Sequence, residues 1–158
     1  PAEHRRLVAA LGDERVAALA REDGLVSSIG LVPPPSRRGV VLIDPSYETK
    51  DASARVLDAL GKAHRRFASG VYAIWYPVIE RRWVERFARA LRAAVAPFDI
   101  YELSVAPDGA VTGLSGSGMI VVNPPWTLRA AMEEALPWLA RTLAVGTTPA
   151  PWRIVERA

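Results

Sequence analysis

The sequence predicts an α/β fold whose sheet is mostly parallel and ends in an antiparallel strand pair. Short β-branched segments alternate with amphipathic helical segments, which is the pattern of strands joined by crossover helices. The last two clear strands are joined by a loop, residues 107–118, that is too short for such a helix, so we expect them to pair antiparallel. The chain has 158 residues, half of them hydrophobic. This is enough for one compact domain with a sizeable core.

The elements are expected in a definite order. Residues 3–11 have the apolar spacing of a helix, and residues 15–21 suit either a helix or a short strand. Residues 25–32 are expected to form a short helix, which three prolines end. Val40 to Ile43 is a continuous β-branched run, typical of a strand buried on both faces. The other expected elements are strands at residues 71–76 (stopped by Pro77), 98–105 and 119–122, helices at 51–69, 80–95 and 128–143, and an edge strand at 152–155.

The composition excludes several kinds of site. The chain has no cysteine, which excludes disulfides, thiolate metal sites and a cysteine nucleophile. His4 and His64 are sixty residues apart with no third ligand nearby, so we expect no metal site. No segment resembles a signal peptide or approaches the roughly 18 apolar residues of a membrane span. We therefore expect a cytoplasmic protein with no membrane partner; its oligomeric state stays open.

The basic residues are unevenly distributed. The formal charge is +3, but residues 55–92 hold nine basic and three acidic residues, which gives +6 there and −3 elsewhere. Such a stripe is able to contact the phosphates of a nucleic acid. Two solvated helix faces explain it equally well.

Two polar motifs follow predicted strands. Asp44-Pro45-Ser46-Tyr47 follows residues 40–43, and Asn123-Pro124-Pro125-Trp126 follows residues 119–122. Each combines a carboxylate or amide, a rigid turn and an aromatic ring. The side-chain oxygen and the next carbonyl can accept hydrogen bonds from an amine, and the ring can stack on a flat base. Since ligands of open α/β sheets bind at the carboxyl ends of strands, the motifs indicate a base-binding site.

Such a tetrapeptide resembles the motif of methyltransferases that act on exocyclic amines. Four ordered blocks, at residues 36–39, 44–48, 72–77 and 117–126, together resemble the family that methylates an adenine N6 in bacterial 23S ribosomal RNA. The likeness runs along the whole chain. It implies a Rossmann-like class I methyltransferase sheet, S-adenosylmethionine as cofactor without a metal, and 23S ribosomal RNA as partner.

The resemblance also chooses between the two motifs. In class I methyltransferases the reactive tetrapeptide follows the fourth strand, which is the place of Asp44, Pro45 and Tyr47. It implies that Asp44 and the Pro45 carbonyl accept hydrogen bonds from the adenine amine while Tyr47 stacks on the base. Ser46 stands where the family has proline, which restores a backbone N–H and loosens the turn. The motif at Asn123 is given a supporting role, at the pocket rim or as a cap of the following helix.

Further site residues follow from the same likeness. It implies that Asp23 and Gly24 lie beside the adenine of the cofactor, with Asp44 also on the cofactor side. An ordinary Asp-Gly turn is an equal alternative for the first two. On the substrate side we expect Ser46, Tyr47, Glu48 and Lys50; the last two flank the reactive turn, and ordinary solvated side chains are the alternative for them.

Two features that class I methyltransferases carry near their N-terminus are not found before Asp23. The chain opens Pro1-Ala2-Glu3-His4, and the two features are the glycine-rich turn and the acidic residue that follow the first two strands of those enzymes. The resemblance thus implies that residues 1–158 are the C-terminal part of a single methyltransferase domain and inactive alone. Two alternatives stay open: a non-catalytic nucleic-acid-binding α/β module, or a role in the use of external DNA.

Overall fold

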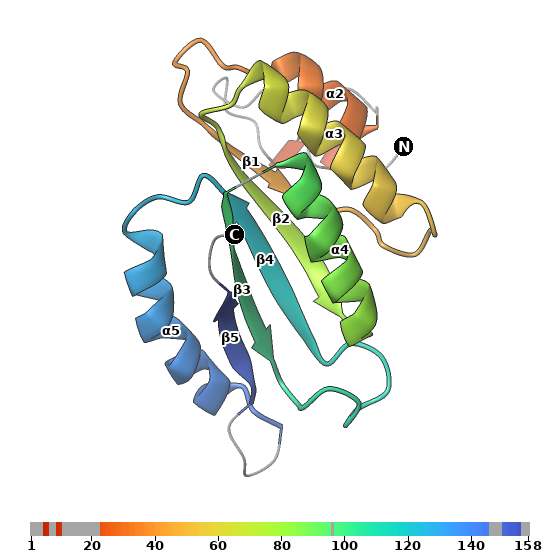
Figure 1. Cartoon of the computed structure of the whole chain (residues 1–158), viewed down its shortest axis with the longest axis vertical. Helices are drawn as coiled ribbons and strands as arrows, with labels where there is room; N and C mark the ends of the chain where they lie inside the picture. The colour runs from red at the N-terminus through yellow and green to blue at the C-terminus, as the bar shows by residue number, and fades with distance from the viewer. Residues whose placement is uncertain (1–4, 7–8, 11–22, 96, 146–149, 156–158) are drawn as a thin grey trace.

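The computed structural model describes residues 5–6, 9–10, 23–95, 97–145 and 150–155. Five strands form one mixed sheet, in the order β1-β2-β4-β3-β5 (Figure 1). The strands are β1 (Val40–Ile43), β2 (Val71–Val78), β3 (Phe98–Ser104), β4 (Gly116–Val122) and β5 (Trp152–Val155). The helices are α2 (Gly24–Leu31), α3 (Ala52–Arg66), α4 (Arg81–Ala94) and α5 (Leu128–Thr142). The expected helix over residues 3–11 and the segment 15–21 lie largely outside the described residues.

The strand directions correct one part of the predicted sheet. β1 and β2 pair in parallel, and β3 and β4 pair antiparallel as expected. However, β4 also pairs antiparallel with β2, and β5 pairs antiparallel with β3. β1, β2 and β3 therefore run in one direction, but only the β1–β2 pairing is parallel, because β4 inserts between β2 and β3. The sheet is mixed rather than mostly parallel.

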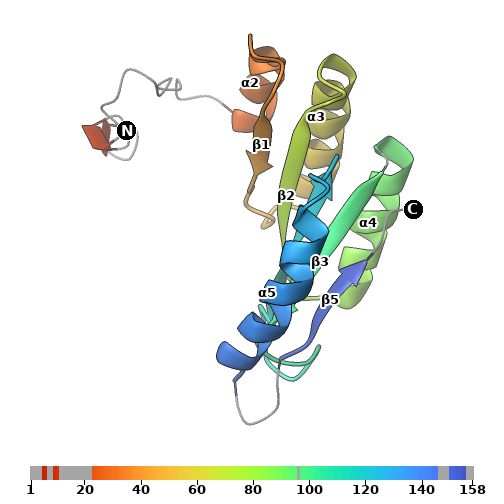
Figure 2. The same cartoon turned by 90° about the vertical axis from the view of Figure 1, so that its left-hand side faces the viewer.

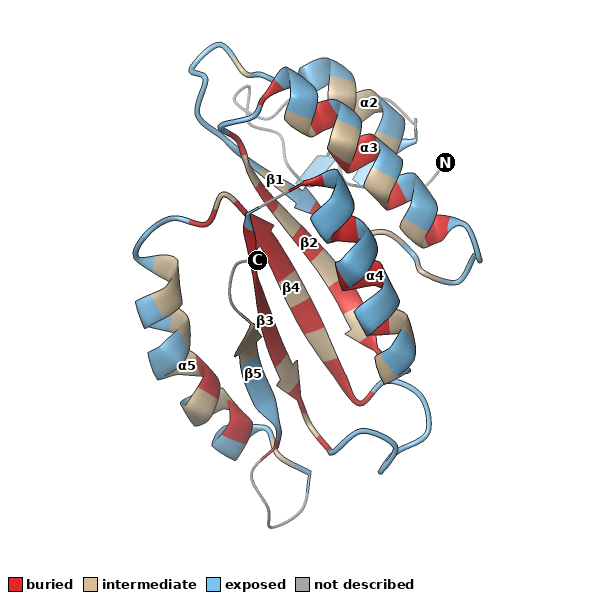
Figure 3. Ribbon diagram, viewed as in Figure 1, coloured by how far each residue is buried: buried red, intermediate tan, exposed pale blue. Residues whose placement is uncertain are grey.

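The alternation of side chains across the sheet separates two apolar clusters. Residues such as Ile74 and Ile100 face α3 and α4 in the larger cluster, whereas Tyr101 and Val121 face Leu136 of α5 in the smaller one. Successive strand residues point to opposite faces, so α3 and α4 cover one face and α5 the other (Figure 2). The buried residues follow this division, with the inner sides of α3 and α4 against the sheet (Figure 3).

The prediction that β1 is buried on both faces is wrong. Val40 and Leu42 are 69% and 66% exposed, while Ile43 is buried. β1 is an edge strand, and α5 packs against β3 and β5 instead. The face of β1 turned away from α3 is therefore uncovered, although its sequence is that of an internal strand.

Two strand boundaries also differ from the prediction. β2 continues through Pro77 to Val78, and Pro77 pairs with Ser117 on the β4 side. β1 pairs only with residues 71–74, so proline is tolerated where β2 has no neighbour on its other side. β4 begins at Gly116 rather than Met119, because residues 116–118 pair with β2 on one side and with β3 on the other.

Gly118 is predicted to be essential for the close packing of β4 against β2. It pairs with Tyr76, and a Cβ atom on Gly118 would overlap the Tyr76 ring, which is fully buried. We expect Gly118→Ala to lower the free energy of unfolding by about 2–3 kcal/mol, the upper range for overpacking. Urea unfolding measures this. The control is Gly30→Ala in α2, where a Cβ meets nothing within 4 Å; equal stability of the two variants would contradict the packing argument.

Candidate functional site

Asp44 lies at the carboxyl edge of the parallel strand pair. It directly follows β1 and is exposed, and within the described part of the chain its carboxylate has no hydrogen-bond or ion-pair partner. Pro45 is half-buried, and Ser46 is exposed beside it. Because β1 and β2 run in parallel, the same edge also carries the end of β2. Asp44 is thus an unengaged acceptor at the edge where such sheets bind ligands.

Tyr47 is anchored by its hydroxyl and held among aromatic rings. The hydroxyl donates a hydrogen bond of 2.8 Å to the backbone carbonyl of Trp75. The ring meets Trp83 at 5.3 Å and Phe87 at 6.1 Å between centroids, both edge to face. Burial, with a smaller contribution from the charge of Asp44, raises the pKa of Tyr47, so the hydroxyl stays protonated and keeps this bond. None of these described ring contacts is a parallel stack.

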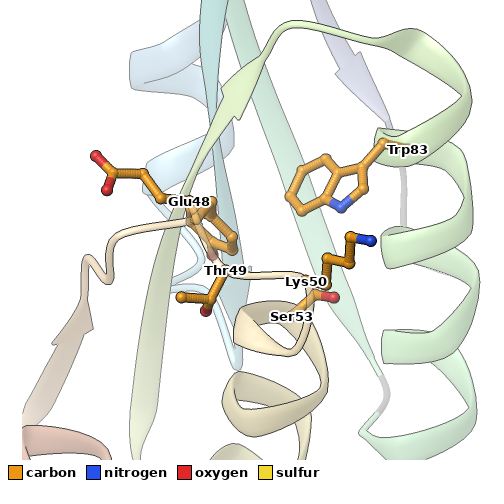
Figure 4. Close-up of a pocket in the computed structure, with 6 residues that line it drawn as sticks. Glu48, Thr49, Lys50, Ser53 and Trp83 are labelled. Atoms are coloured by element: carbon orange, nitrogen blue, oxygen red, sulfur yellow. The ribbon is translucent and has the colours of Figure 1, made fainter.

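A hollow of about 300 Å³ opens beside Tyr47. Its lining residues come from the loop after β1 and from the first turns of α3 and α4: Tyr47, Glu48, Thr49, Lys50, Ser53 and Trp83. Figure 4 shows the side chains of Lys50 and Trp83 turned toward each other, with Glu48 pointing away from both. The structure therefore brings the predicted Tyr47, Glu48 and Lys50 together at one hollow.

Three lining residues were missed by the sequence analysis. Thr49 and Ser53 bracket the start of α3, and Trp83 lies in the first turn of α4. An aromatic residue in an amphipathic helix is usually expected in the core. Trp83 is only half-buried, however, and its ring stacks on Phe87 at 5.2 Å. One feature of the sequence could have indicated these residues. Both helices begin shortly after a strand ends, so side chains in their first turns lie at the edge of the sheet where the site is.

Asp23 has contacts within the chain. It is the N-cap of α2, where one carboxylate oxygen accepts a hydrogen bond of 3.0 Å from the Leu25 N–H, and its other oxygen pairs with Arg55 of α3. It does not line the hollow beside Tyr47. Gly24 has open space where a Cβ would stand. These contacts account for Asp23 as a helix cap; its place beside a cofactor stays a prediction.

The second motif lies at the other end of the strands. Asn123 follows β4, and its side-chain amide donates hydrogen bonds of 2.7 and 2.9 Å to the carbonyls of Ala68 and Gly70, just before β2. β4 runs opposite to β1 and β2, so its end lies at their beginning. Asn123 thereby fastens the α3–β2 connection and does not cap α5, whose N-cap is Thr127. The motif still contributes to the start of that helix, because the Pro125 carbonyl accepts a hydrogen bond of 2.9 Å from the Leu128 N–H. Its role at a pocket rim stays a prediction.

The basic stripe is divided by its contacts. Five of its members interact with carboxylates, a backbone carbonyl or an aromatic ring: Arg55, Lys62, Arg66, Arg81 and Arg92. Four exposed members have no ion pair within the described residues: Arg65, Arg82, Arg86 and Arg89. Three of the four lie on α4, so the free positive charge is concentrated on that helix.

A buried ionic cluster joins α4 to the antiparallel strands. Glu102 of β3 is 2% exposed and accepts hydrogen bonds from Tyr76 at 2.5 Å, from Arg81 at 2.8 Å and from Arg153 at 2.5 Å. Arg81 also bonds to Asp108 at 2.8 Å. Burial opposes ionisation of Glu102, but these donors outweigh it and lower its pKa. Local sequence patterns do not predict this cluster, because its members are scattered over 78 positions.

The described ranges contain no group of three or more histidine, cysteine or acidic side chains placed to hold a metal ion. None of the helices in those ranges is long and apolar enough to cross a bilayer.

Comparison with known proteins decides the family. The model of the family described as ribosomal RNA large subunit methyltransferase D, RlmJ, matches residues 1–154. The chain belongs to this family. Relatives named ribosomal RNA large subunit methyltransferase J include one from Haemophilus influenzae, 40% identical over 144 residues, and one from Escherichia coli, 36% identical over 160 residues.

The family relationship extends to the fold. The crystal structure of a Legionella pneumophila protein is 28% identical and covers the whole chain with a TM-score of 0.84. The matches cover 90% of this chain and 51% of the Haemophilus relative, and 99% of this chain and 57% of the Escherichia relative. They cover 58% of the Legionella chain. The chain therefore spans between half and three fifths of the length of the family members it matches.

Proposed function

We propose that this protein transfers a methyl group from S-adenosylmethionine to the N6 amine of an adenine in 23S ribosomal RNA. The observation that carries the proposal is the exposed carboxylate of Asp44 at the carboxyl edge of β1, which has no hydrogen-bond or ion-pair partner among the described residues, in a chain of the ribosomal RNA methyltransferase family. The nearby Tyr47, Lys50 and Trp83 supply aromatic and basic groups suited to a nucleotide.

The proposed mechanism follows from the poor nucleophilicity of the adenine amine, whose lone pair is delocalised into the ring. Asp44 and the Pro45 carbonyl accept hydrogen bonds from the two N–H groups, which favours the pyramidal, more nucleophilic amine. Tyr47 offers a ring without a parallel partner for the base to stack on, and this fixes its approach. The amine nitrogen would gain the methyl group that the cofactor supplies, and its surplus proton would pass to water at the exposed edge beside Asp44. A paired adenine has to leave its helix first.

Two of the residues predicted on the cofactor side have accessible groups that suit such a role. Asp44 is free to accept hydrogen bonds, and the open space at Gly24 leaves its backbone accessible. S-adenosylmethionine, when bound, supplies the electrophilic methyl group. Asp44 and Gly24 would hold it from the acceptor side, with Asp23 contributing if its contacts with Arg55 rearrange. This set of residues supports our proposal of a single, cytoplasmic methyltransferase domain.

Mass spectrometry of ribosomal RNA tests the proposed function directly. We expect N6-methyladenine to disappear from one position of 23S ribosomal RNA when the gene is deleted, and to return when it is restored. An unchanged methylation profile would reject the proposal. Loss of growth on external DNA with unchanged methylation would favour that alternative instead.

Two substitutions of Tyr47 distinguish the role of its ring from the role of its hydroxyl. Tyr47→Phe removes the bond to the Trp75 carbonyl but keeps the ring, so we expect about 1 kcal/mol lower stability and retained methylation. Tyr47→Ala removes the ring. Since stacking of a base on an aromatic side chain is worth about 1–3 kcal/mol, we expect kcat/KM to fall roughly 10- to 100-fold for the product of the complete reading frame. Equal activity of the two variants would argue against a stacking role.

A further inference from the structure

We propose that the outer face of α4, together with the groove between α4 and β5, binds the sugar–phosphate backbone of RNA outside the target nucleotide. This inference rests on the proposed function and extends it, because it assigns a surface for the rest of the substrate. It is carried by a row of free arginines, by the chemistry of the groove and by the position of α4 next to the site.

The row consists of Arg82, Arg86 and Arg89, which we call the α4 ridge. These residues recur at spacings of four and three, so they lie on one side of the helix, about 6 Å and then about 4.5 Å apart along its axis. All three are exposed, and none has an ion pair within the described residues. The ridge presents three guanidinium groups at spacings comparable to those of successive phosphates, and Glu85 is the one carboxylate of α4 on the same side.

The groove adjoins the ridge on its β5 side and measures about 230 Å³. Arg89, Arg92 and Arg153 line it, and the apolar side chains of Val84, Ala88, Ile100 and Val155 form the rest of its wall, with Glu85 as the one carboxylate. Three guanidinium groups against one carboxylate favour an anion, and apolar walls suit the ribose or the flat face of a base. This is the chemistry of a nucleotide rather than of a free inorganic anion.

Two of the groove arginines are already held in place. Arg92 lies over the Phe98 ring at 5.6 Å, and Arg153 is hydrogen-bonded to buried Glu102. Restrained guanidinium groups lose less side-chain entropy when they bind a phosphate. Glu102 offsets part of the charge of Arg153, so the free charge of the groove comes mainly from Arg89 and Arg92.

The position of α4 connects this surface to the proposed site. The helix begins just after the carboxyl end of β2, where Trp83 lines the hollow beside Tyr47, and it extends about 20 Å along the sheet. α5 lies on the opposite face (Figure 2) and is less basic, with Glu133 paired to Arg129. An RNA strand whose target base lies at Asp44 and Tyr47 is therefore able to continue along α4.

The test measures the affinity of the chain for protein-free 23S ribosomal RNA at several salt concentrations. Arg89→Glu is compared with Arg141→Glu, which makes the same charge change at an exposed residue of α5. We expect Arg89→Glu to weaken binding several-fold and to lower the salt slope by about 1. The double variant R86E/R89E is expected to weaken binding at least tenfold, with a slope lower by about 2. The α5 variant is expected to stay within twofold of the wild type.

Equal weakening by the α4 and α5 variants would overturn the proposal, because it would indicate a general charge effect. Unchanged RNA affinity in R86E/R89E would also overturn it and would leave an acidic protein as the occupant. Thermal unfolding of each variant checks that the fold is retained. Loss of RNA affinity in a protein that never methylates RNA would support this surface while rejecting the proposed activity, so the two failures are distinguishable.

Discussion

Asp44→Ala is expected to abolish methyl transfer in the product of the complete reading frame. Asp44 is exposed and unengaged within the described residues, so its removal breaks no described contact of the fold, while the adenine amine loses its charged acceptor. Loss of a group that acts on the reacting atoms in the transition state costs about 10²–10⁴ in rate. The measurement is transfer of labelled methyl groups to protein-free 23S ribosomal RNA. Asp44→Asn keeps an acceptor without the charge, and we expect intermediate activity from it.

The matched control for Asp44 is Asp51→Ala. Asp51 is an exposed carboxylate seven residues further on, at the start of α3, and its side chain makes no capping bond. We expect near wild-type transfer from this variant. Turnover retained by Asp44→Ala, with an unchanged melting temperature, would remove Asp44 from the reaction and would favour a non-catalytic nucleic-acid-binding module.

Glu102→Ala is expected to destabilise the fold by about 3–5 kcal/mol, the usual cost of removing one partner from a buried ion pair. The change leaves the Tyr76 hydroxyl buried without its acceptor and two guanidinium groups close together without their shared carboxylate. Urea unfolding measures the loss. The control is Glu134→Ala on α5, an exposed position, where we expect a change within about 0.5 kcal/mol. A Glu102→Ala variant within 1 kcal/mol of the wild type would show that the cluster is not needed for stability.

The same carboxylate predicts a pH dependence. Its pKa in the folded state lies below its ordinary value of 4.5, so the folded state binds the proton more weakly than the unfolded state does. Its contribution to stability is therefore complete above pH 4.5 and is lost as the pH falls below that value. We expect Glu102→Gln to lose less stability than the wild type between pH 5 and pH 3. A parallel loss in both proteins would assign the acid sensitivity to other carboxylates.

Several features of the fold were predictable because they depend on local patterns. The β-branched run at residues 40–43 and the apolar spacing in residues 81–94 specify a strand and a helix wherever they lie in the protein. The connection before β4 is too short for a parallel crossover, so an antiparallel pair with β3 was predictable. The motif from Asp44 to Tyr47 was identifiable for the same reason, since its residues are adjacent and follow a strand directly.

Other features depend on residues that are distant in the sequence. β4 lies between β2 and β3 and pairs with both. The order of strands along the sequence does not specify this position, so the sequence did not predict that β2 and β3 are not paired in parallel. Position 118 accepts only glycine because the Tyr76 ring occupies the space that a Cβ atom would need. The exposure of Val40 and Leu42 depends on what covers β1, and the sequence of the strand itself does not record that.

The sequence by itself determined the elements, the family resemblance and the reactive motif at Asp44, because each is written in neighbouring residues. Only the tertiary structure decided which basic side chains form contacts and where a hollow opens beside the motif. Among the described residues, five of the nine basic residues of the stripe make contacts, while Arg82, Arg86 and Arg89 on α4 have no ion pair. The hollow at Tyr47 combines residues 47–53 with Trp83 from a distant part of the sequence. The physical reason is that ion pairing, burial and cavity shape depend on distances between side chains, which local periodicity does not specify.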